Sequence, residues 1–303
     1  MALASSALIA HTTDLELVIR HVLAGLGQGV HAGRERGAGV EFSEYRAYAP
    51  GDEWRRVDWK LLARADRYYV REAERDSHVA VWLVLDASAS MAEPSRSVKG
   101  LDKLGYARTL LACIAAIAQR QGDAFGLAVL ANGRVQFLPA SRGPRQLQRV
   151  LAKLKQVQAE GDLPDAGVLR TGLRFTASPS LIFAASDFLD WPSSLSDALV
   201  RLRHMRHDVR AVCLQTEAEC EGSFDSGPAY RDPERNIRRD AAVFRFGADL
   251  REAYLRNREA HFDTVTAALR ASDVLKVSAR IEQAPGEVLR HWLRQRLGNG
   301  GRR

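Results

Sequence analysis

The sequence predicts an α/β protein built on a mostly parallel, doubly wound sheet of the Rossmann type. A small N-terminal segment precedes this sheet, and an α/β extension follows it. From residue 79 onward the chain contains short, continuous apolar runs, which are typical of strands buried in a parallel sheet. These runs alternate with longer segments of helical apolar periodicity, an order that calls for helices on both faces of the sheet.

The composition is that of an ordinary globular protein. Of the 303 residues, 46% are hydrophobic and 27% are charged, which excludes a disordered polymer. No apolar run approaches the roughly 18 to 20 residues that a spanning helix needs, and the N-terminus lacks the positive region of a secretory signal. Cys113, Cys213 and Cys220 show no C-x-x-C spacing, so we expect free thiols rather than disulfides or a cysteine metal site. We therefore expect a cytoplasmic protein in a reducing compartment.

Residues 1–78 are predicted to form the N-terminal segment. An amphipathic helix is expected from Leu15 to Leu23, with Thr12 or Thr13 as its N-cap. A connector rich in Gly and Arg follows. The later expectations are a turn at Pro50-Gly51, a short helix from Asp52 to about Ala63 and a strand at residues 68–70.

Residues 79–215 are predicted to be the central domain. Strands are expected at residues 79–85, 125–130, 135–138, 181–185 and 209–214, with helices at 103–120, 144–157, 166–175 and 195–205. An Asn132-Gly133 hairpin turn joins two of these strands, which predicts one antiparallel edge.

Residues 216–303 are predicted to be the extension packed on the central domain. A polar loop comes first. The expected elements after it are a strand near 243–246, a helix at 249–270, a strand at 274–281 and a helix at 286–297.

Oxygen-bearing side chains follow the first buried strand of the central domain. Asp86, Ser88 and Ser90 occupy alternate positions of the loop that leaves this strand. Ligands collect at the carboxyl ends of strands in open α/β sheets, and hard oxygen ligands are those that Mg²⁺ prefers. Asp187 follows a later buried strand, and adjacent parallel strands would bring it beside Asp86.

This arrangement resembles the metal-ion-dependent adhesion site of von Willebrand factor A domains. In that family the two serines bind the cation directly, the acids act mainly through waters, and a partner protein often supplies an acidic oxygen. The resemblance implies Mg²⁺, or else Mn²⁺ or Ca²⁺, held by Asp86, Ser88, Ser90 and Asp187.

The upstream segment resembles the bacterial domain-of-unknown-function family number fifty-eight, and this resemblance extends from about Gly37 to the final helix. Members are typically encoded beside MoxR-type AAA+ ATPases and are thought to act with them in chaperone-like maturation of other proteins. The resemblance therefore implies a non-enzymatic adaptor whose partners are such an ATPase and client proteins. The matching blocks are Gly37 to Asp52 with its Pro-Gly-Asp end, Arg56-Val57-Asp58-Trp59, Ala63-Arg64 and Val70-Arg71-Glu72.

One departure from the family pattern concerns the metal site. The family usually carries a Thr in a Gly-Gly-Thr-Asp-type loop, whereas residues 160–167 of this chain contain no Thr. Asp162 or Asp165 could contribute an oxygen instead, and Thr171 lies further on, inside the expected helix. A missing hydroxyl would weaken cation binding or leave another water in its place.

Structural explanations compete with these functional ones. Ser88 and Ser90 could merely cap the following turn, with Asp86 accepting hydrogen bonds from loop amides. The aromatic residues near the Pro-Gly-Asp block could form a partner-binding patch or, as we expect, a small core: Tyr45, Tyr48, Trp54 and Trp59.

Two other classes of function were weighed against the adaptor. The net charge of +7 suits a basic scaffold that binds nucleic acid or an anionic membrane surface. However, the charge is dispersed and no nucleic-acid motif is recognised, so no nucleic acid is expected, while peripheral membrane contact stays open. A hydrolase is disfavoured because the sequence has no G-x-S-x-G and no H-E-x-x-H motif. The chain also lacks G-x-x-x-x-G-K-[ST], so it is not itself the ATPase.

Overall fold

The computed structural model describes residues 14–27, 44–47, 69–72, 80–173, 179–224, 229–230, 244–245 and 248–294. The chain divides into two compact units, one formed by Val30–His78 and the other by Met1–Gly29 together with Val79–Arg303. In the smaller unit, β1 (Glu44–Ala47) pairs antiparallel with β2 (Tyr69–Glu72). The strand predicted at 68–70 is confirmed, whereas the turn at Pro50-Gly51 and the helix from Asp52 lie outside the described residues.

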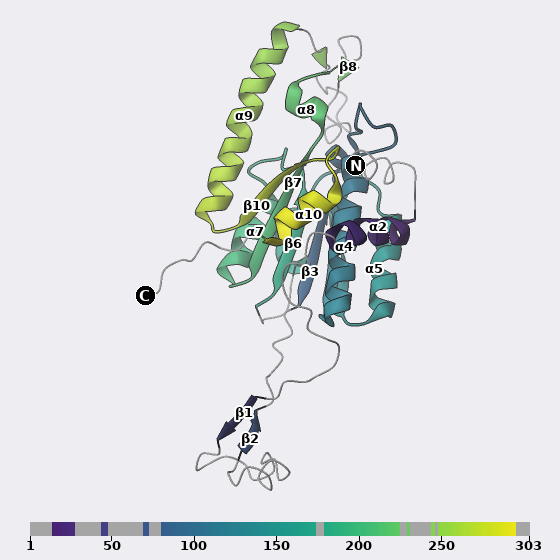
Figure 1. Cartoon of the computed structure of the whole chain (residues 1–303). Coiled ribbons are helices and arrows are strands. Elements are labelled where there is room, and N and C mark those ends of the chain that lie inside the picture. Colours follow the sequence, from purple (N-terminus) through teal and green to yellow (C-terminus); the bar gives the residue numbers. More distant parts are fainter. Residues whose placement is uncertain are drawn as a thin grey trace. The chain divides into compact units, whose positions relative to one another are not determined.

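The centre of the larger unit is a sheet in which six described strands follow the order β10-β7-β6-β3-β4-β5 (Figure 1). Five of these strands run parallel, and β5 pairs antiparallel with β4 at one edge. The predicted α/β class with an antiparallel edge is therefore confirmed. The strands are β3 (Val81–Asp86), β4 (Phe125–Ala131), β5 (Arg134–Ser141), β6 (Leu181–Ser186), β7 (Asp208–Gln215) and β10 (Leu275–Arg280).

Helices cover both faces of this sheet (Figure 1). One face carries α2 (Leu15–Gly27), α4 (Lys103–Gln121), α5 (Pro144–Gln156) and α10 (Pro285–Arg294). The other carries α6 (Ala166–Gly172), α7 (Ser194–His204) and α9 (Ala248–Ala271).

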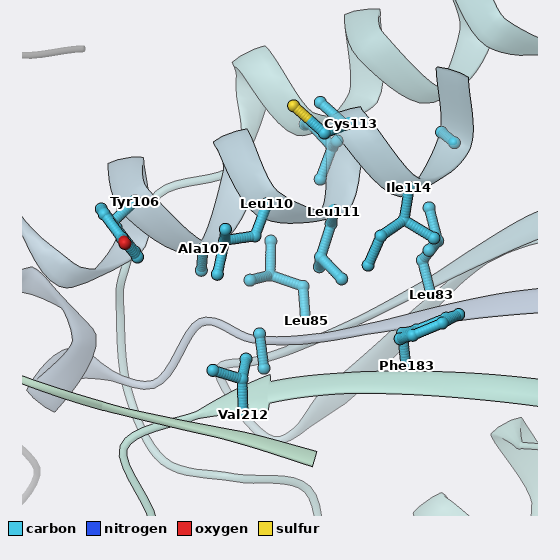
Figure 2. Packing of buried hydrophobic residues seen from close by; sticks show 14 of the residues in the cluster. Leu83, Leu85, Tyr106, Ala107, Leu110, Leu111, Cys113, Ile114, Phe183 and Val212 are labelled. Carbon is cyan, nitrogen blue, oxygen red and sulfur yellow. The ribbon is translucent and has the colours of Figure 1, made fainter. Parts of the chain in front are cut away.

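Strand β3 shows why its continuous apolar run suits a central position. Successive side chains of a strand point to opposite faces, and Leu83 and Leu85 accordingly join the core under α4 while Trp82 and Val84 join the opposite core. In Figure 2, Leu83 and Leu85 face the α4 side chains, including Leu111. A fully buried side chain of this size contributes about 1.5–3 kcal/mol, so both faces of β3 stabilise the sheet.

Two local predictions about helices are corrected by the structure. Asp14 caps α2, because its Oδ1 accepts hydrogen bonds from the amides of Glu16 at 3.0 Å and Leu17 at 3.4 Å. The predicted caps, Thr12 and Thr13, lie outside the described residues. The polar loop expected after residue 216 instead begins with the short helix α8 (Glu217–Glu221), which a capping box stabilises.

The C-terminal range contributes directly to the central sheet, since β10 pairs in parallel with β7. The strand predicted near 243–246 corresponds to β9 (Phe244–Arg245), which pairs antiparallel with β8 (Ala229–Tyr230). Helix α2 belongs to the larger unit and contacts α4 and α10. The division into residues 1–78, 79–215 and 216–303 stays a prediction.

The three cysteines are free thiols, as predicted. Cys113 and Cys213 are buried, and burial raises the pKa of each thiol to about 12. Among the described helices, none is long and apolar enough to cross a membrane.

Gly126 in β4 provides a test of the packing between β4 and β3. A Cβ atom at this position would lie 2.3 Å from Cζ3 of Trp82 and 2.8 Å from the carbonyl oxygen of Leu138. We expect Gly126→Ala to lower the free energy of unfolding by about 1–3 kcal/mol, because the neighbouring ring and backbone must shift. Urea unfolding followed by circular dichroism measures this change.

The matched control is Gly167→Ala in α6, where an added Cβ meets nothing within 4 Å. This substitution is expected to raise stability by about 0.4–1 kcal/mol, since alanine restricts the unfolded chain. Equal effects of the two substitutions would contradict the tight packing at Gly126.

Candidate functional site

Asp86 ends β3 and is the centre of the candidate site. Its side chain is buried, and its Oδ1 accepts hydrogen bonds from the Ser88 amide at 2.9 Å and the Ser88 hydroxyl at 2.8 Å. The Ser186 hydroxyl donates to Oδ2 at 2.6 Å. Among the described residues no cationic side chain pairs with this carboxylate, and its hydrogen-bond donors are all neutral. Burial, with repulsion from Asp187, raises the pKa of Asp86 to about 7.

The two serines bring their hydroxyls together beside Asp86. The Oγ atoms of Ser88 and Ser90 lie 3.2 Å apart, with Ser88 buried and Ser90 half-buried. Ser88 precedes a 3₁₀ turn at Ala89–Ala92, but its side chain caps no amide of that turn. The capping alternative is therefore wrong for Ser88, whereas Asp86 does accept a hydrogen bond from a loop amide. The oxygens of Asp86, Ser88 and Ser90 converge.

Asp187 lies at the same edge of the sheet, because β6 pairs in parallel with β3 and aligns Ala185 with Leu85. Its Oδ1 accepts a hydrogen bond from the Leu189 amide at 3.2 Å, and its Oδ2 accepts one from Lys103 Nζ at 3.0 Å. The thiol of Cys213 in β7 lies 3.5 Å from the carbonyl oxygen of Asp187. The structure therefore brings Asp187 to the edge that carries Asp86 and pairs it with a lysine.

Lys103 and Glu219 complete a buried ion-pair group that sequence reasoning missed. Lys103 has no exposed surface, and its Nζ also donates to Glu219 Oε1 at 2.6 Å. Glu219 is held by the capping box of α8, in which its Oε2 accepts a hydrogen bond from the Thr216 amide at 2.7 Å. One available signal was the place of Lys103 in the first turn of a helix, where the helix dipole disfavours a cation.

The charges of this edge do not balance. Asp86, Asp187 and Glu219 carry three negative charges when ionised, and Lys103 supplies one positive charge, which leaves a net charge of two minus. Buried charges are costly unless they are paired. A divalent cation would balance this excess.

The donor set fits Mg²⁺ in its chemistry, because a carboxylate and hydroxyls are hard oxygen ligands. Among the described residues there is no group of three or more His, Cys, Asp or Glu that could hold a metal ion, so hydroxyls and waters would have to supply part of the shell. The residues that would hold the cation are Asp86, Ser88 and Ser90, since the Oδ2 of Asp187 is engaged by Lys103.

Residues 160–162, which stand in place of the family's threonine loop, are joined to the Asp86 loop through the backbone. The Glu160 amide donates to the Ala87 carbonyl at 3.0 Å, and the Ala89 amide donates to the Gly161 carbonyl at 2.9 Å. On the far side, the Asn132 amide donates to the Glu160 carbonyl at 3.0 Å. Three loops are thereby held together at this edge of the sheet.

The proposed substitutes for the missing threonine make no side-chain contact with the serines. Asp162 and Asp165 are both exposed, and within the described part of the chain neither carboxylate hydrogen-bonds to Ser88 or Ser90. The Thr171 hydroxyl donates to the Gly167 carbonyl inside α6. The structure therefore groups Asp86, Ser88, Ser90 and Asp187 but leaves these three residues outside the hydrogen-bonded set.

Solved structures with a similar arrangement include a conserved hypothetical protein, BatB, from Bacteroides thetaiotaomicron. It is 15% identical, with a TM-score of 0.44 over 72% of this chain and 100% of that chain. The von Willebrand factor A domain of SpRpn10 is 10% identical, with a TM-score of 0.42 over 74% of this chain and 99% of that chain. Both TM-scores lie below 0.5, so the fold assignment rests on the strand order and helix arrangement given above.

Sequence comparison gives the family of the chain. Uncharacterized proteins of Mycobacterium tuberculosis and Mycobacterium bovis are each 30% identical over 286 residues, covering 91% of this chain and 86% of the relative. The model of the family described as "Protein of unknown function DUF58" matches residues 44–263, which is more than half of the chain. The chain therefore belongs to the DUF58 family.

Proposed function

We propose that the chain is a non-enzymatic, protein-binding adaptor that cooperates with a MoxR-type AAA+ ATPase in the chaperone-like maturation or assembly of other proteins. The single observation that carries the proposal is the Asp86 carboxylate, buried at the carboxyl edge of the sheet beside two converging serine hydroxyls. This arrangement suits a cation that receives a further oxygen from a partner protein.

The surroundings of Asp86 support a binding role. Ser90 is half-buried, so it lies between the buried carboxylate and the surface, and Leu189 is 45% exposed two residues beyond Asp187. An exposed apolar side chain beside a polar centre is a common feature of protein interfaces. A bound cation would supply a Lewis-acidic position for an acidic side chain of the partner.

The choice of an ATPase as partner is supported by the family and by a feature of the sequence. The chain has no phosphate-binding G-x-x-x-x-G-K-[ST] loop, so any ATP-driven step must come from another protein. The resemblance to family fifty-eight points to MoxR-type ATPases as that protein. The proposed compartment is the cytoplasm, where such ATPases have access to ATP.

Asp86→Asn tests the proposal in a pull-down from native lysate, read by mass spectrometry. Asparagine keeps the acceptor oxygen but removes the charge that a cation needs. We expect recovery of the ATPase with Mg²⁺ to fall about tenfold, which corresponds to roughly 1.4 kcal/mol of binding free energy. The variant and the unaltered chain are compared at one Mg²⁺ concentration, because EDTA also removes the cation that an ATPase needs for its nucleotide.

The matched control is Asp263→Asn on an exposed position of α9, which is expected to capture as much ATPase as the unaltered chain. Equal recovery with Asp86→Asn would remove the Asp86 site from the mechanism. Recovery of no ATPase, together with a binding partner that is lost steeply with salt, would instead favour the basic scaffold.

A further inference from the structure

Lys103 is a fully buried cation that the adaptor proposal leaves without a role. Its ammonium donates to Asp187 Oδ2 at 3.0 Å and to Glu219 Oε1 at 2.6 Å. These contacts connect the start of α4 with the end of β6 and with α8 after β7. A buried lysine between two carboxylates is expected to stay charged, and attraction to Asp187 and Glu219 raises its pKa above its ordinary value.

Asp187 has little freedom to leave this pair. Its Oδ1 accepts a hydrogen bond from the Leu189 amide, and its carbonyl oxygen lies 3.5 Å from the Cys213 thiol. The following residue, Phe188, adopts a left-handed backbone with φ of 53° and is itself buried. The Phe188 amide donates to the Ser186 hydroxyl at 3.0 Å. The carboxylate is therefore fixed toward Lys103.

We propose that Lys103 is a positioning residue that acts as the internal counter-ion of Asp187 and Glu219, and that it thereby restricts an external cation to the Asp86 loop. The cation is then held by one carboxylate and two hydroxyls, which makes its binding weak and exchangeable. This inference rests on the proposed function only in taking Asp86, Ser88 and Ser90 as the cation ligands.

The consequence is a low intrinsic affinity for divalent ions. With Asp187 neutralised by Lys103, one unpaired acid remains for the cation, whereas a freed Asp187 would give the site two. Affinity in oxygen sites rises with the number of charged ligands. A weakly held cation would depend more on an oxygen from a partner, which suits a reversible contact.

The experiment measures binding of Mg²⁺ and Mn²⁺ alone to the purified full chain by isothermal titration calorimetry, after treatment with EDTA. The main variant is Lys103→Met with Glu219→Gln, which removes one positive and one negative charge and so keeps the net charge. We expect about tenfold tighter binding than in the unaltered chain, and a thermal midpoint that rises more on adding Mg²⁺. Lys103→Arg keeps the charge and is expected to behave like the unaltered chain.

A third substitution identifies the ligand responsible. Adding Asp187→Asn to the double variant is expected to cancel the gain in affinity, whereas a purely structural role of Lys103 would leave the affinity unchanged in every variant. If the double variant does not fold, Lys103→Met with Glu219→Met replaces the pair by apolar side chains and is measured in the same way. Sodium chloride at equal ionic strength controls for screening.

The results separate this inference from the proposed function. Equal, measurable affinity in the unaltered chain and the double variant overturns the role of Lys103 but leaves the Asp86 site intact. Binding only in the double variant supports the role of Lys103 and removes the cation from the adaptor mechanism. No binding in either overturns both the counter-ion role and the metal part of the proposed function, while capture of the ATPase is decided by the pull-down.

Discussion

Lys103→Ala is expected to lower the free energy of unfolding by about 3–5 kcal/mol when divalent cations are absent. The substitution leaves Asp187 and Glu219 buried at the end of the sheet with no cation between them. Their mutual repulsion and the cost of holding unpaired charges away from water act in the same direction. Urea unfolding in EDTA, followed by circular dichroism, gives the change in stability.

Two comparisons show whether the effect comes from the unpaired charges. Lys155→Ala, at an exposed position near the end of α5, removes a positive charge from the surface and is expected to cost less than about 1 kcal/mol. Replacing Lys103, Asp187 and Glu219 together by Met, Leu and Met is expected to cost much less than Lys103→Ala, because apolar replacement of a buried ionic group is often neutral. A loss below about 1 kcal/mol for Lys103→Ala would contradict the buried pairing.

Trp292→Ala is expected to cost about 3–5 kcal/mol, as is usual when a large buried side chain is removed. Trp292 lies on α10 with no exposed surface, and its ring meets Phe183 of β6 edge to face, with ring centroids 5.0 Å apart. Removing the ring leaves a cavity between α10 and the sheet. Arg210 also donates to the Trp292 and Leu293 carbonyls, at 3.3 and 3.0 Å, and these backbone contacts do not depend on the ring.

Trp292→Phe is the control for this prediction. Within the described structure the indole Nε1 has no hydrogen-bond partner, so phenylalanine removes an unsatisfied donor while it keeps most of the packing. We expect the loss to be below about 1.5 kcal/mol, in the range of conservative core exchanges. Comparable losses for alanine and phenylalanine would show that the hydrogen-bonding group, rather than the volume, decides stability.

The fold was predictable because its signals are local. Continuous apolar runs such as Val81 to Leu85 predict buried parallel strands, and the Asn132-Gly133 turn predicts the antiparallel hairpin of β4 and β5. The position of Asp187 near Asp86 also followed from the sequence, because parallel neighbours end at the same edge. These inferences need only periodicity, turn chemistry and the rules of sheet topology.

The charge partners of the site were not predictable from these signals. Lys103 contacts Asp187 and Glu219 across 84 and 116 residues of sequence, and neither contact leaves a periodic pattern. Glu219 lies on a five-residue helix in a stretch whose polar composition resembles a loop. The pairing is decided by which loops meet at the end of the sheet, and this depends on tertiary packing.

The backbone connections among the loops at residues 87–89, 132–133 and 160–162 have a consequence for the cost of recognition. Gly161 has a φ of 61°, and a side chain there would collide with Asn132, whose Cα would lie 2.9 Å from the new Cβ. The loop that presents Asp86 is therefore ordered by the hairpin before any partner arrives. Ordering a loop on binding normally opposes association. A partner that docks at this edge meets a surface already fixed in shape, and even a small set of contacts can then give a usable affinity.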